Sequence, residues 1–355
     1  MFMAEPSLAK IAYQTLQQGK GLLGIAHKEI STKLMGYFLP EAIPDTSHIT
    51  KELLLDLRRS IKDLEEIDWG DAERGLYPRN LLFEAPWIEW FLKYPLVWLD
   101  MPSTWSRRKD RNFQDIPNSI NKEKYPDYYL QNFHQQTDGY LSDYSASIYD
   151  IQVEILFNGT ADAMRRRVIA PLKTGIDKYF PEINDSSLKI LDLATGTGRT
   201  LQQLRSAFPK SELTGLDLSA SYLKQASKYL NNSDNELVQL INGNAEKVPL
   251  LDESFQAITC VFLFHELPGE ARDNVIKECF RLLKPNGVLI LADSLQLRDS
   301  TEFSPVLENF HRIFHEPYYK NYIKDDIDLR LTQNGFKYVN SDSYFMTKVW
   351  SAIKS

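Results

Sequence analysis

The stretch Leu188-Lys-Ile-Leu-Asp-Leu-Ala-Thr-Gly-Thr-Gly-Arg-Thr200 decides the fold of this chain. Its apolar beginning lacks polar alternation, which is typical of a strand covered on both faces, as in a parallel sheet. Gly196 and Gly198 then allow a tight loop, because glycine adopts positive φ without steric cost. A helix is expected to follow over residues 199–207, with its free N–H groups directed back at the loop.

Beyond residue 188, short apolar runs alternate with helical patterns. This alternation predicts an α/β fold, a Rossmann-like sheet of seven mostly parallel strands with helices on both faces. The last two apolar runs, 336–340 and 347–353, are too close together for a crossover helix, so the sheet should end in a C-terminal antiparallel hairpin. The other expected strands are 188–193, 212–216, 237–241, 257–262 and 288–292, and the expected helices are 199–207, 220–230 and 270–283.

The residues before this core predict two further regions, so that the chain divides into an N-terminal helical region (1–125), an aromatic lid with connecting helices (126–179) and the core (180–355). Apolar residues at helical spacing predict helices over 8–16, 22–38 and 48–68. Prolines and mixed charge over 101–127 predict an irregular cover. A further helix is expected from about Met164 to Tyr179.

The segment 81–99 is the most apolar in the chain and contains three tryptophans. Charged residues and two prolines interrupt it, which argues against a transmembrane span. Packing on the core or on another subunit is the favoured interpretation. Peripheral contact with a membrane is the alternative, since tryptophan and tyrosine favour the bilayer interface.

Composition narrows the class of protein. The chain has 355 residues and a formal net charge of −7, which gives no general attraction to nucleic acid. The basic runs 107–111 and 165–167 are expected to be solvated surface. With only Cys260 and Cys279, neither a disulfide framework nor a zinc site with paired cysteines is available, so no metal site is expected. A cytoplasmic location is expected, because no signal peptide is visible at the N-terminus.

Ligands on such sheets bind at the carboxyl ends of the strands, and suitable side chains follow several of the expected strands. Asp217 ends the second strand and could accept both hydroxyls of a ribose. Asn244, followed by Ala245, comes after the third strand and could bind the edge of an adenine. The run Phe262-Leu-Phe-His-Glu-Leu-Pro268 comes after the fourth strand, where a substrate would meet a cofactor.

A glycine loop with a downstream acid also occurs in nicotinamide-dependent oxidoreductases. Their fingerprint requires a third glycine three residues after the second, and this chain has Leu201 there. A nicotinamide-dependent oxidoreductase therefore remains an alternative, although this chain lacks the third glycine of the fingerprint.

The motifs as a set resemble the class I S-adenosylmethionine-dependent methyltransferases, closest to the branch of ubiquinone and menaquinone C-methyltransferases (methyltransferase type 11). The resemblance spans about residues 180–355. It departs at Ala194, where many members have a glycine, and at Asn244, where an aspartate is more usual. The residues that carry it are Leu191-Asp-Leu-Ala-Thr-Gly-Thr-Gly198, Leu216-Asp-Leu-Ser219, Asn244-Ala-Glu-Lys-Val-Pro-Leu250, Asp252-Glu-Ser-Phe255 and Arg281-Leu-Leu-Lys-Pro-Asn-Gly287.

The resemblance implies S-adenosyl-L-methionine as cofactor. The glycine loop would hold its methionine end, Asp217 its ribose, and Asn244 with Ala245 its adenine. Aromatic faces could also attract the sulfonium cation. The residues expected to bind the cofactor are Asp192, Ala194, Thr195, Gly196, Gly198, Asp217, Leu218, Asn244, Ala245, Phe262, Tyr129 and Tyr140.

The expected activity is C- or O-methylation of a small, hydrophobic or aromatic molecule. His265 is the first candidate for a catalytic base and His134 the second, since imidazole titrates near neutral pH. The chain has no Asn-Pro-Pro-Tyr motif and no Pro-Cys dipeptide, which argues against methylation of nucleic-acid bases. A non-catalytic protein that binds the same cofactor is the remaining alternative. The sequence leaves the oligomeric state open.

Overall fold

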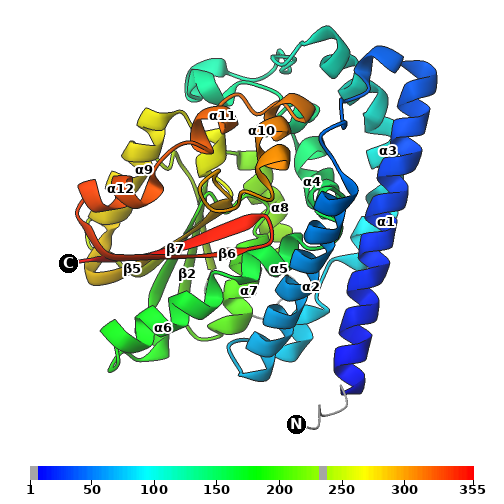
Figure 1. Cartoon of the computed structure of the whole chain (residues 1–355). Coiled ribbons are helices and arrows are strands. Elements are labelled where there is room, and N and C mark those ends of the chain that lie inside the picture. The colour runs from blue at the N-terminus through cyan, green and yellow to red at the C-terminus, as the bar shows by residue number, and fades with distance from the viewer. Residues whose placement is uncertain (1–6, 232–237) are drawn as a thin grey trace.

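The computed structural model describes residues 7–231 and 238–355, and a seven-stranded sheet forms its centre (Figure 1). The strand order is β3-β2-β1-β4-β5-β7-β6; the first five of these are parallel, and β7 is antiparallel to both of its neighbours. The predicted α/β fold and its C-terminal hairpin are confirmed. The strands are β1 (Lys189–Leu193), β2 (Glu212–Asp217), β3 (Val238–Asn242), β4 (Phe255–Val261), β5 (Leu283–Ser294), β6 (Phe336–Tyr344) and β7 (Thr347–Lys354). The predicted third strand began at Leu237, which lies outside the described residues.

Both faces of the sheet are buried, because successive side chains of each strand point in opposite directions. In β5, Val288 and Ile290 pack in one apolar cluster with helices α6, α7 and α8, whereas Leu289 and Leu291 pack in another with α9 and α12. The predicted helices 199–207, 220–230 and 270–283 agree with the structure to within one residue. The bounds are α6 (Ile169–Tyr179), α7 (Arg199–Ala207), α8 (Ala220–Asn231), α9 (Gly269–Leu282) and α12 (Ile327–Gln333).

The N-terminal residues form one long helix where two were predicted. Helix α1 (Leu8–Phe38) runs without a break and stands along one side of the molecule (Figure 1). Glycines inside it allow close packing: a Cβ on Gly24 would lie 3.1 Å from the carbonyl oxygen of Ile155. Gly24 therefore serves the packing of α1 against residues near Ile155. Helix α2 (Lys51–Glu73) follows and begins at Thr50, whose side chain accepts a hydrogen bond from Leu53 N.

Helix α3 (Trp87–Asp110) passes through Pro95 and Pro102, so the irregular structure predicted from residue 101 is wrong for its first ten residues. Each proline removes one helical hydrogen bond. Burial of the inner face of the helix offsets that loss, since Trp90, Val97 and Trp105 are all buried. None of the helices within residues 7–231 and 238–355 combines the length and the apolar character needed to cross a bilayer.

The remaining helices lie around the carboxyl ends of the strands. The helix predicted over about 164–179 is divided, because the chain leaves regular helix between Arg166 and Ile169. The bounds are α4 (Asp143–Leu156), α5 (Ala161–Arg166), α10 (Ser304–Ile313) and α11 (Tyr319–Tyr322).

Asp68 of α2 is fully buried and joins the N-terminal helices to the residues before the sheet. Its carboxylate accepts hydrogen bonds from Tyr13 Oη (2.8 Å), Tyr77 Oη (2.7 Å), Arg166 Nε (2.8 Å) and Arg167 Nη2 (2.6 Å). Burial alone would raise the pKa of this carboxyl, but the two guanidinium groups outweigh it and lower the pKa of Asp68 to about 2.

The prediction that the two basic runs are solvated is therefore wrong for most of their arginines. Arg165, Arg166 and Arg167 are all buried, and so is Arg107 of α3. Each guanidinium is matched by internal acceptors: Arg165 pairs with Asp162 at 3.1 Å, for example. These arginines act as internal connectors between helices, because buried charges are tolerated only when they are paired.

Candidate active site

A pocket lies at the carboxyl ends of β1, β2 and β4, the edge at which sheets of this kind bind ligands. Its wall combines the glycine loop after β1 with tyrosines from the segment that precedes the sheet. The predicted cofactor residues that line it are Tyr129, Tyr140, Ala194, Thr195, Gly196, Asp217, Leu218, Asn244, Ala245 and Phe262. Four other predicted residues, Asp192, Gly198, His134 and His265, are not among its lining residues.

The loop after β1 adopts the backbone that its glycines suggested. Gly196 and Gly198 have φ values of 56° and 82°. Ala194 has φ 58° as well, so the alanine takes the left-handed conformation that glycine favours. A Cβ on Gly196 would meet no atom within 4 Å, which leaves open space beside this part of the loop.

Asp217 holds that loop in place from the end of β2. Its Oδ2 accepts a hydrogen bond from Gly196 N and its Oδ1 one from Ser219 N, both at 2.8 Å. Burial raises the pKa of Asp217 to about 6, against the opposing effect of those backbone donors. Each carboxylate oxygen can accept a further hydrogen bond, so the group can still bind hydroxyls in the pocket.

Asp192 lies behind the loop and fixes it. Its oxygens accept hydrogen bonds from Thr195 Oγ1 (2.6 Å) and Thr259 Oγ1 (2.7 Å). Gly198 is also a packing residue: a Cβ there would lie 2.9 Å from Cβ of Ala226 in α8. The structure therefore places these two predicted residues in support of the loop, away from the pocket surface.

Asn244, which follows the third strand, lines the pocket, and its side-chain oxygen already accepts a hydrogen bond. Its Oδ1 accepts a hydrogen bond from Glu246 N at 2.8 Å, which closes a local turn. Within residues 7–231 and 238–355 the amide NH₂ group makes no hydrogen bond, so the oxygen of Asn244 shapes the turn while the nitrogen can donate to a ligand.

Aromatic side chains form another part of the pocket wall. Tyr129, Tyr140 and Tyr149 line the pocket, as does Tyr222 of α8, which had no sequence signal. The ring of Tyr140 contacts those of the other three, with centroid distances of 5.3–6.0 Å. Tyr140 also donates a hydrogen bond to Glu266, a second carboxylate on the pocket wall.

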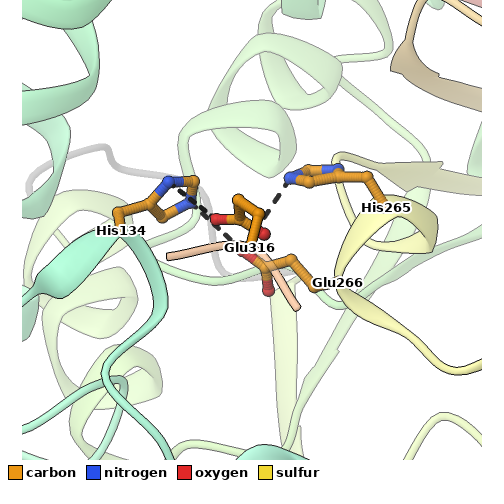
Figure 2. Close-up of side chains that lie close together, drawn as sticks. All are labelled: His134, His265, Glu266 and Glu316. Carbon is orange, nitrogen blue, oxygen red and sulfur yellow. Dashed lines mark ion pairs between the residues drawn. The ribbon is translucent and has the colours of Figure 1, made fainter. Parts of the chain in front are cut away.

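The two candidate bases lie behind Glu266 and form a cluster with it and Glu316 (Figure 2). His265 Nδ1 lies 2.7 Å from Asp293, and His134 Nε2 lies 3.3 Å from Glu266. Burial alone would lower both imidazole pKa values. The neighbouring carboxylates outweigh it, with Asp293 raising the pKa of His265 to about 9 and Glu316 that of His134 to about 10.

Sequence reasoning missed the two carboxylates of this cluster, Glu266 and Glu316, and the neighbouring Asp293. Asp293 lies near the end of β5, so the rule of strand carboxyl ends could have found it. Glu266 was inside the quoted run after β4 but was not chosen. Glu316 comes from the connection between α10 and α11, where the sequence offers no signal.

Part of the chain is similar in sequence to known proteins. Residues 190–287 match a family described as a methyltransferase domain. Together with the strand order and the glycine loop, this match identifies a methyltransferase domain within residues 190–287, which confirms the resemblance to class I S-adenosylmethionine-dependent methyltransferases inferred from the motifs.

Curated relatives are similar over part of their length. A demethylmenaquinone methyltransferase of Thermotoga maritima is 36% identical over 155 residues, which cover 44% of this chain and 60% of that protein. A ubiquinone/menaquinone biosynthesis C-methyltransferase of Desulfotalea psychrophila is 29% identical over 149 residues, or 42% of this chain and 54% of that protein. The chain thus spans less than two thirds of either relative.

Among solved structures, human N-acetylserotonin methyltransferase in complex with SAM is similar at 17% identity and a TM-score of 0.41. The match covers 59% of this chain and 58% of that one. Likeness at this level carries no functional argument.

Proposed function

We propose that this protein is an S-adenosylmethionine-dependent methyltransferase that acts on a small, hydrophobic or aromatic molecule. The observation that carries the proposal is the position of Asp217. Its carboxylate is hydrogen-bonded to the loop at Gly196, beside open space, in a pocket that tyrosines also line. That combination suits a ligand with a ribose at one end and a cationic centre near aromatic faces.

The residues present fit the cofactor part by part. Asp217 would accept the ribose hydroxyls, and Asn244 with Ala245 would lie along the adenine. The cofactor supplies a methyl group on a sulfonium. The tyrosines Tyr129 and Tyr140 would face that cation and keep water from it, and the loop would orient it for in-line attack.

The methyl acceptor must lose a proton when it is methylated, so its identity and the group that takes the proton are considered together. The names of the relatives suggest a quinone-type molecule, methylated on carbon, while O-methylation of a phenol is the second possibility. Both need a group that can take a proton. His134 and His265 hold theirs near neutral pH, so Glu266, which lines the pocket and lies 3.3 Å from His134, is the group placed to receive one.

Cofactor binding tests this proposal. We expect calorimetry to detect binding of S-adenosylmethionine but not of NADH. Asp217→Ala should weaken the former at least tenfold, about 1.4 kcal/mol or more, because charge-assisted hydrogen bonds are lost. Asp185→Ala, an exposed carboxylate before β1, should leave affinity unchanged. Binding of NADH but not of S-adenosylmethionine would favour the oxidoreductase alternative, despite Leu201 at the position of its third glycine.

Turnover separates an enzyme from a non-catalytic binding protein. Labelled S-adenosylmethionine should transfer its methyl group to at least one member of a panel of quinols, phenols and isoprenoid acids. A chain that binds the cofactor but methylates none of them would favour the non-catalytic alternative.

A hydrophobic acceptor also gives a role to helix α3. Its outer face exposes Ile88, Phe91, Leu92 and Leu99, each with at least 69% of its surface accessible. We infer a cytoplasmic protein that contacts a membrane peripherally through residues 81–99. Such a face would keep the pocket close to a lipid-dissolved substrate.

Lipid binding tests that role. The wild-type chain should float with anionic liposomes, and the double variant Phe91→Ser/Leu92→Ser should bind at least tenfold more weakly, since two large apolar side chains are lost. Leu251→Ser is the matched control, because Leu251 is 82% exposed outside α3. A wild-type chain that stays at the bottom of the gradient contradicts membrane contact.

A further inference from the structure

Four side chains with metal-binding atoms converge behind the pocket. One ligand atom from each of His134, His265, Glu266 and Glu316 lies within 4.8 Å of the others. Figure 2 shows the two histidines on opposite sides with Glu316 and Glu266 between them. The chain brings them together from three separate segments, so their meeting is a property of the tertiary structure.

Glu316 is the residue that calls for an additional partner. Its side chain is fully buried, and within the described parts of the chain neither carboxylate oxygen accepts a hydrogen bond. Oε1 does lie 2.9 Å from His134 Nδ1, an ion pair when that imidazole is protonated, but the contact lacks hydrogen-bond geometry and leaves the nitrogen without a hydrogen bond. A buried carboxylate without hydrogen bonds is costly, so a further ligand is expected there.

His265 is oriented as a metal ligand would be. Its Nδ1 is engaged by Asp293 at 2.7 Å, which leaves Nε2 directed at the cluster, 3.9 Å from Glu266. Asp293 is itself fixed by accepting from Phe264 N at 2.7 Å. A carboxylate behind a histidine sets the tautomer and the ring orientation in many metal sites.

We propose that His134, His265, Glu266 and Glu316 bind one divalent first-row transition metal ion. Two imidazole nitrogens and two carboxylates suit zinc, iron or manganese, whereas magnesium favours sites built from oxygen alone. With neutral imidazoles, the three carboxylates, counting Asp293, carry a charge of −3, which a dication would reduce to −1. If the proposed function holds, the ion would lie next to the acceptor, because Glu266 borders the pocket.

The test uses the full chain, stripped of metal with a chelator and then titrated with zinc. Calorimetry and elemental analysis should give about one zinc ion per chain, with manganese weaker and magnesium not detected. Glu316→Gln should weaken zinc binding at least tenfold, and Asp293→Asn by 10–100-fold through the orientation of His265. Glu308→Gln, an exposed glutamate of α10, is the matched control and should bind like the wild type.

Absence of zinc binding by the wild-type chain would overturn the inference, as would equal zinc affinity in the wild type and Glu316→Gln. If Glu316→Gln fails to fold by circular dichroism, His134→Asn is judged by the same criterion. Cofactor binding by the stripped wild-type chain is measured in parallel. Cofactor binding without zinc binding would contradict only the metal site. Zinc binding without cofactor binding would contradict only the proposed function.

Discussion

Replacing Asp68 with asparagine should lower the free energy of unfolding by about 3–5 kcal/mol, the usual cost of breaking a buried ion pair from one side. The substitution keeps the shape of the side chain but removes the charge that balances Arg166 and Arg167. Both guanidinium groups are almost fully buried, so water cannot replace the lost partner. Urea unfolding followed by circular dichroism measures the change.

Asp56→Asn on the same helix is the control. Asp56 pairs with Arg59 at 3.1 Å, and that arginine side chain is 71% exposed. Exposed pairs of this kind contribute less than about 1 kcal/mol. Equal losses of stability in the two variants would contradict the connecting role of Asp68.

The effect of Asp68 should also depend on pH. The folded-state pKa is about 2, below the ordinary value of 3.8. Its contribution is therefore fully present above pH 4 to 5 and is lost as the pH falls toward about 2. The stability difference between the wild type and Asp68→Asn should stay constant from pH 5 to 8 and narrow below about pH 4.

The second large effect is expected in the glycine loop, where two glycines serve different purposes. Gly198→Ala should destabilise the fold by about 2–4 kcal/mol, because backbone strain adds to a clash. Its new Cβ would lie 2.9 Å from that of Ala226. Gly196→Ala carries only the strain, about 1–2 kcal/mol, but its Cβ would enter the open space beside the loop.

The two variants are each other's control. Gly198→Ala should show the lower melting temperature, and Gly196→Ala should bind S-adenosylmethionine at least tenfold more weakly than the wild type. Differential scanning fluorimetry and calorimetry measure the two quantities. A lower melting temperature for Gly196→Ala than for Gly198→Ala would show that the open space is not where the structure places it.

The core could be predicted from sequence because its signals are local. Each strand is a short apolar run, and each glycine of the loop indicates a positive φ at its own position. Ala194 shows the limit of that reasoning: it adopts φ 58° although alanine gives no sign of it, because the neighbouring residues impose the conformation.

The buried charges could not be predicted in the same way. Arg165, Arg166 and Arg167 look like any solvated basic run, since their partners Asp68 and Asp162 are recognised only once the helices pack. Helix α3 continues past two prolines for a related reason, because its buried face outweighs the local penalty. Glu316 is the extreme case, a residue whose surroundings come entirely from the tertiary structure.

The position of Asp68 has a consequence for the order in which the chain can fold during synthesis. Domains generally form from the N-terminus as the polypeptide emerges from the ribosome. Here Arg166 follows Asp68 by 98 residues, so helices α1 and α2 leave the ribosome well before the cations that neutralise their buried carboxylate. Their final packing must wait for α5, and a nascent chain halted between the two would present an incomplete helical layer to chaperones.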